Sequence, residues 1–175
     1  MVNRIFTVAF LAGSICSASA PVHAQTAQGP DLVQETYRDW VVRCATPDAA
    51  QDTRICEMTQ DISQAETGQR LLGLALQATE SGAELSIVTP FGLRLSNGVT
   101  LAVEAGPVAK IAFRTCLPQG CIASTQLDDA ALAQLGTSEA VDVLLTTDSG
   151  QTATLSVSLG GFVGAFSRLE NLREQ

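Results

Sequence analysis

Short runs of alternating apolar and polar residues cover most of the chain from Tyr37 to Leu159. Such alternation places every second side chain on one face of a β-strand, so each run predicts a strand with one buried face. In the last run, Leu155, Val157 and Leu159 share one face, and serine and threonine residues occupy the other. Turn residues separate the runs at short intervals, which predicts about nine short antiparallel strands.

The densest group of turn signals lies in residues 90–123, PFGLRLSNGVTLAVEAGPVAKIAFRTCLPQGCIA. Asn97-Gly98 predicts a two-residue hairpin turn, because type I′ turns need positive φ at both central residues. Gly106-Pro107 predicts a second turn, and residues 117–120 separate two cysteines. We therefore expect three short strands here, closed by a cysteine pair.

One segment, residues 127–136, has helical rather than strand periodicity. Asp128 can cap the first free amides of a helix, and Gly136 suits a left-handed stop. A further helical turn is expected within residues 162–169. The fold class predicted is all-β: a single-domain β-sandwich or flattened barrel of about nine short antiparallel strands with one short helix.

The N-terminus resembles an export signal. Arg4 is followed by a short apolar stretch and by Val22-His23-Ala24, the small-x-Ala pattern at which signal peptidase cuts. The predicted organisation is a cleaved signal peptide at residues 1–24, a flexible leader at 25–36, the β domain at 37–170 and a polar tail at 171–175. We expect a periplasmic protein with no transmembrane segment in the mature chain, and outer-membrane association or secretion remains open.

Cleavage after Ala24 would change the available chemistry, because His23 is the single histidine of the chain. Without imidazole, Ser-His-Asp catalysis, Cys-His catalysis and histidine-containing metal sites are excluded, and we expect no metal and no cofactor. Four cysteines would remain, and an even count in an oxidising compartment predicts two disulfides. Of the three pairings, the local one is favoured because each pair brackets a turn-like segment: Cys44–Cys56 with Cys116–Cys121.

The chain is acidic, with a formal net charge of −8, and removing Arg4 leaves −9. This charge argues against nucleic acid as a partner. A catalytic role is not expected either: the start of a helix explains the Asp128-Asp129 pair, and Lys110 has the setting of a solvated strand residue. The chain is therefore predicted not to be an enzyme.

Three side chains are candidates for ligand binding. Arg94 and Arg114 are expected on neighbouring strands, where two guanidinium groups could share one face and hold a carboxylate or sulfate. Trp40, the only tryptophan, could stack on a ligand, although a core position beside a disulfide is the favoured interpretation.

Several motifs together resemble one known family, the invasion-associated locus B proteins, which are small exported proteins of alphaproteobacteria. The resemblance rests on Trp40 with Cys44 and Cys56, Pro90-Phe91-Gly92 with Leu95 and Gly98, Phe113, Cys116, Gly120, Cys121 and Ala123, and Ser158-Leu159-Gly160-Gly161-Phe162. It covers almost the whole mature chain and implies an exported β domain. It implies no reaction and no catalytic residues.

Three hypotheses about function follow. The first is an exported, disulfide-stapled interaction protein of the envelope, which binds a protein of the envelope or of a host surface and aids host-cell interaction. The second is a periplasmic β-sandwich that binds a small ligand or glycan through Arg94, Arg114 and Trp40. A hydrolase with carboxylates assembled across strands ranks last.

Overall fold

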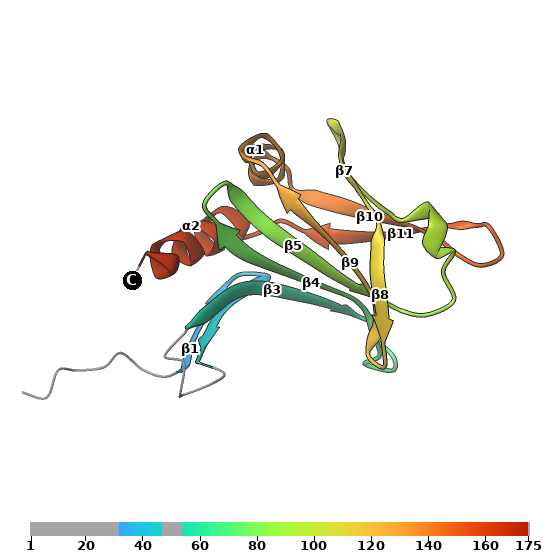
Figure 1. Cartoon of the computed structure of the whole chain (residues 1–175), viewed down its shortest axis with the longest axis horizontal. Coiled ribbons are helices and arrows are strands. Elements are labelled where there is room, and N and C mark those ends of the chain that lie inside the picture. The colour runs from blue at the N-terminus through green and yellow to red at the C-terminus, as the bar shows by residue number, and fades with distance from the viewer. Residues whose placement is uncertain (1–31, 47–53, 175) are drawn as a thin grey trace, which may run out of the picture.

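The computed structural model describes residues 32–46 and 54–174 of the 175-residue chain. The expected signal peptide, its cleavage site and most of the expected leader lie outside these residues. Within them, eleven strands form two antiparallel sheets and are accompanied by two α-helices (Figure 1). The two sheets are separate, so the structure is a sandwich and not the flattened barrel that the sequence also allowed.

The larger sheet has seven strands in the order β1-β2-β3-β4-β5-β9-β8. Its strands are β1 (Leu32–Tyr37), β2 (Trp40–Ala45), β3 (Ile55–Ser63), β4 (Arg70–Thr79), β5 (Gly82–Thr89), β8 (Phe113–Leu117) and β9 (Gly120–Leu127). The first five are joined in sequence as a meander. β9 then pairs with β5 and β8 pairs only with β9, so β8 forms one edge of the sheet.

The smaller sheet has four strands in the order β11-β10-β6-β7. They are β6 (Val99–Val103), β7 (Gly106–Ile111), β10 (Ala140–Thr146) and β11 (Thr152–Ser158). Helix α1 (Asp129–Thr137) joins β9 to β10 and contacts both sheets, and α2 (Phe162–Arg173) lies against β1 to β4 at the left of Figure 1. The smaller sheet and α2 together cover the larger sheet.

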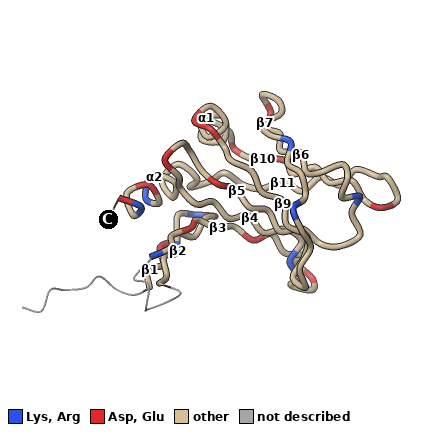
Figure 2. Tube along the Cα trace, in the orientation of Figure 1, with Lys and Arg blue, Asp and Glu red and all other residues tan. Residues whose placement is uncertain are grey.

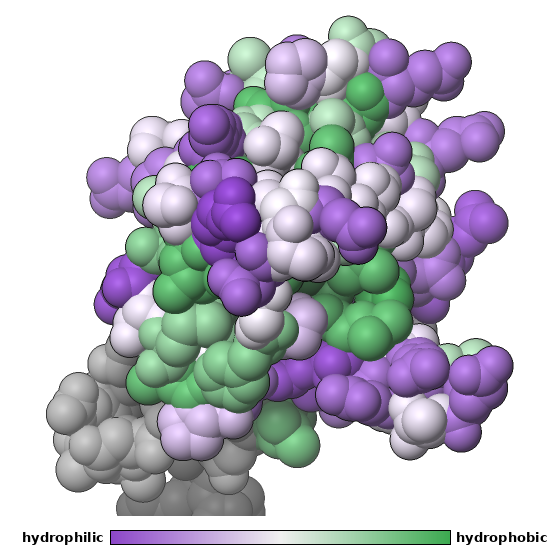
Figure 3. Space-filling view, turned by 90° about the vertical axis from the view of Figure 1, so that its right-hand side faces the viewer, coloured by the Kyte–Doolittle hydropathy of each residue, from purple (hydrophilic) through white to green (hydrophobic). Residues whose placement is uncertain are grey.

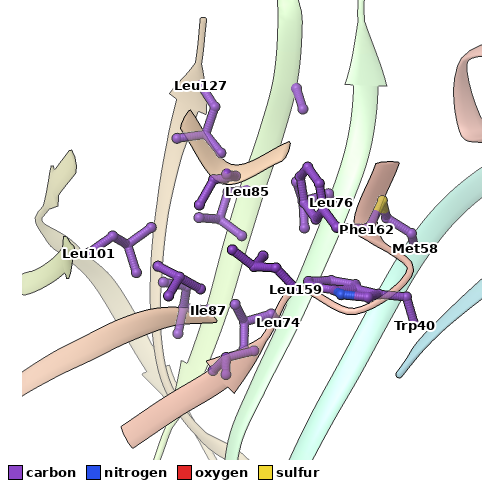
Figure 4. Close-up of a cluster of buried hydrophobic side chains, with 14 of the residues drawn as sticks. Trp40, Met58, Leu74, Leu76, Leu85, Ile87, Leu101, Leu127, Leu159 and Phe162 are labelled. Carbon is purple, nitrogen blue, oxygen red and sulfur yellow. The ribbon is translucent and has the colours of Figure 1, made fainter. Parts of the chain in front are cut away.

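The core lies between the two sheets and beneath α2. The alternation expected from the sequence is present: in β5, Ala83, Leu85, Ile87 and Thr89 are buried while the residues between them are partly exposed. Figure 4 shows part of the cluster, in which side chains from both sheets and from the start of α2 meet. Burial of these alternating positions supplies most of the driving force for folding.

Three boundaries differ from the sequence-based expectation. β1 begins at Leu32, inside the expected leader, because its backbone pairs along the whole of β2. α2 extends to Arg173 and takes in most of the expected polar tail, since Leu172 is buried against the core. Helix α1 continues past Gly136 and is closed by Ser138, whose amide and hydroxyl donate to carbonyls of the last turn.

The Asn97-Gly98 hairpin prediction is wrong. Residues 95–97 form a 3₁₀ turn, η1 (Leu95–Asn97), and the strand that follows pairs with β7 and β10. Gly98 has φ +69°, and a Cβ there would meet the carbonyl oxygen of Ile111. Glycine is therefore needed at this position for a close backbone approach and not for a type I′ turn.

Candidate functional site

Both expected disulfides are present, Cys44–Cys56 and Cys116–Cys121. Each joins residues that face each other directly in neighbouring antiparallel strands, the first across β2 and β3 and the second across β8 and β9. The Cα atoms are 4.0 and 3.9 Å apart. The local pairing favoured by the sequence is confirmed, and the second disulfide fixes the edge strand β8 to the sheet.

Trp40 is a core residue, as the favoured interpretation expected, and the alternative of stacking on a ligand is wrong. Its side chain is 1% exposed, and its indole N–H donates to the Ser158 carbonyl at 3.2 Å. Its ring meets the Phe162 ring edge-on, with centroids 5.4 Å apart. Trp40 thus joins the start of β2 to the end of β11 and the first turn of α2.

Arg94 and Arg114 do not lie on neighbouring strands, which removes the geometry expected for a shared anion site. Arg114 is exposed in the edge strand β8, whose only paired neighbour is β9. Arg94 precedes η1, and its Nη2 donates to the Asp148 carbonyl at 2.8 Å. Arg94 therefore stabilises the loop between β10 and β11, and Arg114 is left as the candidate for recognition.

Residues 90–98 pair in their middle with the end of β10 and the β10–β11 loop, and their two ends are anchored near β8. At the first, the Thr89 hydroxyl donates to the Cys121 carbonyl at 3.2 Å, and a Cβ on Gly120 would collide with the Thr89 carbonyl. At the second, Gly98 packs against the Ile111 carbonyl, just before β8. The two anchors place this segment next to both ends of β8.

This arrangement exposes apolar side chains at one end of the molecule. Three of the large apolar residues that are exposed in the described chain lie here: Phe91, Leu95 and Leu117. We name these residues, together with Arg114 and Cys116, the β8 end surface. Figure 3 views the molecule from this side and shows apolar surface interrupted by hydrophilic side chains. Phe91 and Leu117 lie two and three residues from the contact between Thr89 and Gly120, and exposed apolar residues grouped in this way are typical of interaction sites.

A polar cluster that the sequence did not predict joins β1 to α2. Arg168 holds the Glu35 carboxylate with two N–H groups, Nε to Oε2 at 3.0 Å and Nη2 to Oε1 at 2.8 Å, and the Tyr37 hydroxyl donates to Oε2 at 2.8 Å. The hydrogen bonds from Arg168 and then Tyr37 lower the pKa of Glu35, and the bond to Glu35 raises the pKa of Tyr37. The partners are 133 residues apart, so no local signal could have shown the pair.

The Gly160-Gly161 pair docks onto the turn between β1 and β2. The Asp39 amide donates to the Gly160 carbonyl at 3.2 Å, and the Ser158 hydroxyl donates to the Asp39 carboxylate at 2.6 Å. Gly161 has φ +90°, and a Cβ there would collide with the Tyr37 carbonyl. These contacts give the glycine pair of the C-terminal motif a structural role.

Two hollows lie away from the β8 end surface. An apolar groove of about 350 Å³ separates α1 from α2, and Leu132, Val163 and Phe166 contribute to its walls. A second, acidic hollow of about 800 Å³ includes Glu104 and Glu139. In the described part of the chain, no group of three or more histidine, cysteine or acidic side chains is placed to hold a metal ion.

The residues considered for catalysis have structural explanations. Asp128 caps helix α1 by accepting a hydrogen bond from the Ala131 amide at 2.8 Å, and Asp129 lies in the first turn, where the helix dipole favours negative charge. Lys110 is exposed in β7. None of the described helices has the length and apolar character needed to cross a bilayer.

Comparison with known proteins gives consistent matches over nearly the whole chain. The family model described as Invasion associated locus B (IalB) protein matches residues 40–170. An "Invasion protein B homolog" of Brucella abortus (strain 2308) is 36% identical over 173 residues, which is 97% of this chain and 96% of that protein. "Invasion protein B" of Bartonella bacilliformis is 28% identical over 176 residues, 97% of this chain and 92% of the relative.

A solved structure shares the fold. The crystal structure of invasion associated protein B from Bartonella henselae superimposes with a TM-score of 0.73 at 24% sequence identity, covering 81% of this chain and 97% of that one.

Proposed function

The chain belongs to the invasion associated locus B family, and from that membership we propose that it is an exported interaction protein of the bacterial envelope that takes part in contact with a host cell. The name "Invasion protein B" of the Bartonella bacilliformis relative supports a role at a host surface. Two disulfides support export, since structural disulfides persist in oxidising compartments. We propose binding and not catalysis as its activity.

The observation that carries the proposal is the β8 end surface. Phe91 is 60% exposed, although its segment is fixed at Thr89 and Gly98 and by the hydrogen bonds of Gly92 and Arg94 to the β10–β11 region. Burying a phenylalanine side chain against a partner is worth about 1.5–3 kcal/mol, and large apolar anchors surrounded by polar groups are typical of binding hot spots. The second disulfide keeps this surface preformed, which lowers the ordering cost of binding.

Site-specific photo-crosslinking in intact cells tests the proposal. A photoreactive phenylalanine analogue would replace Phe91 in one strain and Val163 of α2 in another; both native side chains are 60% exposed, but Val163 lies beside the groove between the helices. We expect the analogue at position 91 to capture a reproducible partner and the control to capture none. Capture only from position 163, or from neither position, would refute the assignment of the binding surface.

Export is tested separately. The protein recovered from the periplasmic fraction is expected to begin at Gln25, which the mass of the intact protein measures. A protein that keeps residues 1–24 and stays with the cytoplasmic fraction would contradict the proposed location.

A further inference from the structure

The edge strand β8 has backbone groups that no strand of the described chain pairs with. β8 pairs only with β9, and four of its five residues are exposed: Arg114, Thr115, Cys116 and Leu117. Cys116 faces Cys121 with Cα atoms 3.9 Å apart, a spacing typical of the narrow, non-hydrogen-bonded pair of an antiparallel ladder. In such a pair the backbone N–H and C=O groups point away from the partner strand, so those of Cys116 point outward.

The sandwich has three other edge strands. Of these, β11 contains no charged side chain that could select a partner strand, and β7 and β1 are less available. The edge strand β7 contains Pro107, which cannot donate to a ladder, and β1 is tied to α2 through Glu35. β8 contains no proline and no lysine; its protection consists of a bulge beside Arg114 and the charge of that residue. Leu117 of β8 and Phe91 are exposed, so β8 combines open backbone groups with apolar side chains that a partner could cover.

Charge indicates the character of the missing strand. The chain has a formal net charge of −8, yet β8 carries Arg114, and Lys110 lies close before it in the chain. Neither of the two ion pairs found among residues 32–46 and 54–174 includes these side chains. Figure 2 shows basic positions along this side of the sandwich with acidic positions among them, and positions of both charges at α2. A second copy added symmetrically to β8 would leave Arg114 without an opposite charge, because β8 contains no acidic residue.

We propose that β8 accepts an extended, acidic segment of the partner protein as an added strand of the seven-stranded sheet. Backbone hydrogen bonds to the outward groups of Cys116 provide the attachment, apolar side chains of the segment contact Phe91 and Leu117, and its carboxylates face Arg114. Strand addition of this type obtains affinity from the main chain and specificity from alternate side chains. The inference rests on the proposed function and adds the kind of segment that the β8 end surface recognises.

A synthetic peptide of alternating valine and glutamate, with blocked ends, is the probe. Calorimetry with the oxidised protein is expected to show binding, and hydrogen exchange is expected to show slower exchange of the Cys116 amide. The same peptide with N-methyl groups on alternate amides should lose binding, because it cannot complete a ladder. A peptide of alternating valine and lysine should bind about tenfold more weakly or worse, since exposed charge contacts change affinity by about that factor.

Charge reversal on the protein completes the test. Arg114→Glu is expected to weaken binding of the valine–glutamate peptide about tenfold, and Arg43→Glu, an exposed arginine in β2 of the same sheet, should leave it unchanged. Equal binding of the N-methylated peptide, no binding of any peptide, or faster self-association of the protein in place of peptide binding would each overturn strand addition. If photo-crosslinking from position 91 still captured a partner, strand addition alone would have failed and the proposed function would stand.

Discussion

Replacing Gly161 with alanine should lower the free energy of unfolding far more than the same replacement at another glycine with positive φ. Gly161 has φ +90°, and a Cβ added to it would approach the Tyr37 carbonyl well within 3.0 Å, a separation that real Cβ atoms essentially never show. Both sides of this contact are backbone, of the β1–β2 turn and of the residue before α2. Neither backbone segment can move without displacing its strand or helix, and rotating a side chain cannot relieve the contact.

Two other glycines provide matched controls. Gly68 has φ +67° but nothing within 4 Å of an added Cβ, so Gly68→Ala carries only the left-handed penalty. That penalty is about 1–2 kcal/mol, partly offset by the lower entropy of the unfolded chain, and leaves about 1 kcal/mol of destabilisation. Gly160 has an ordinary φ, and an added Cβ would meet the Asp39 carboxylate and the Ser158 hydroxyl, which are side-chain ends and not backbone. Gly160→Ala should therefore cost about 1 kcal/mol, the worth of the hydrogen bond that it disturbs.

Gly161→Ala carries the same net backbone penalty of about 1 kcal/mol and, in addition, an overpacking cost of about 1–3 kcal/mol, which sums to about 2–4 kcal/mol. Urea unfolding of the oxidised proteins, followed by circular dichroism, measures the three differences in free energy of unfolding. The slope of the free energy of unfolding against urea concentration should be the same in all three variants, since each substitution acts on the native state. A Gly161→Ala variant that loses no more stability than Gly68→Ala would refute the close approach of α2 to the β1–β2 turn.

Three further predictions concern stability. Thiol titration of the denatured, unreduced mature protein, which lacks Cys16, should find essentially no free thiol, and two or more free thiols per chain would contradict the pairing. Removing Cys116–Cys121 should lower the free energy of unfolding by about 2 kcal/mol for so short a loop. The lowered pKa of Glu35 stabilises the fold at a pH above the pKa that Glu35 has in the unfolded chain, and this contribution is lost as the pH falls through its lower pKa in the folded state. Glu35→Gln should therefore make stability depend less steeply on pH in the acid range. An unchanged dependence would show that the contact with Arg168 does not persist in solution. Trp40→Phe removes the indole N–H that donates to the Ser158 carbonyl and leaves a small cavity. We expect the free energy of unfolding, measured in urea, to fall by about 2–3 kcal/mol. A fall below about 0.5 kcal/mol would contradict the burial of this contact.

Local features were predictable from the sequence because their causes are local. The two disulfides join cysteines 12 and 5 residues apart, within the reach of a single hairpin. The strands follow a period of two that depends only on pleating, and the start of α1 depends on the cap at Asp128, three residues from the amide that it binds. The family resemblance rested on the same motifs, and the match over residues 40–170 confirms it.

The error at Asn97-Gly98 has a definable cause. The dipeptide has the residues of a type I′ turn, but positive φ at Gly98 serves equally for a close approach to the Ile111 carbonyl. Only the pairing of the following strand with β10, more than forty positions further along the chain, decides between the two uses. Because no hairpin forms at Asn97-Gly98, Arg94 lies in a loop and not in a strand. The anion site that was expected to include both Arg94 and Arg114 is therefore absent.

The sequence by itself determined the fold class and the start of α1, favoured the cysteine pairing that the structure has, and indicated the buried face of strands such as β5 and β11. Tertiary structure alone decided that β8 is an edge, that Trp40 meets Ser158 across 118 residues, and that Glu35 meets Arg168 across 133. The reason is that closing a longer loop adds little to the cost of a contact, so separation along the chain does not select partners at this range. Complementary faces select them, and these exist only once the sheets have formed and packed.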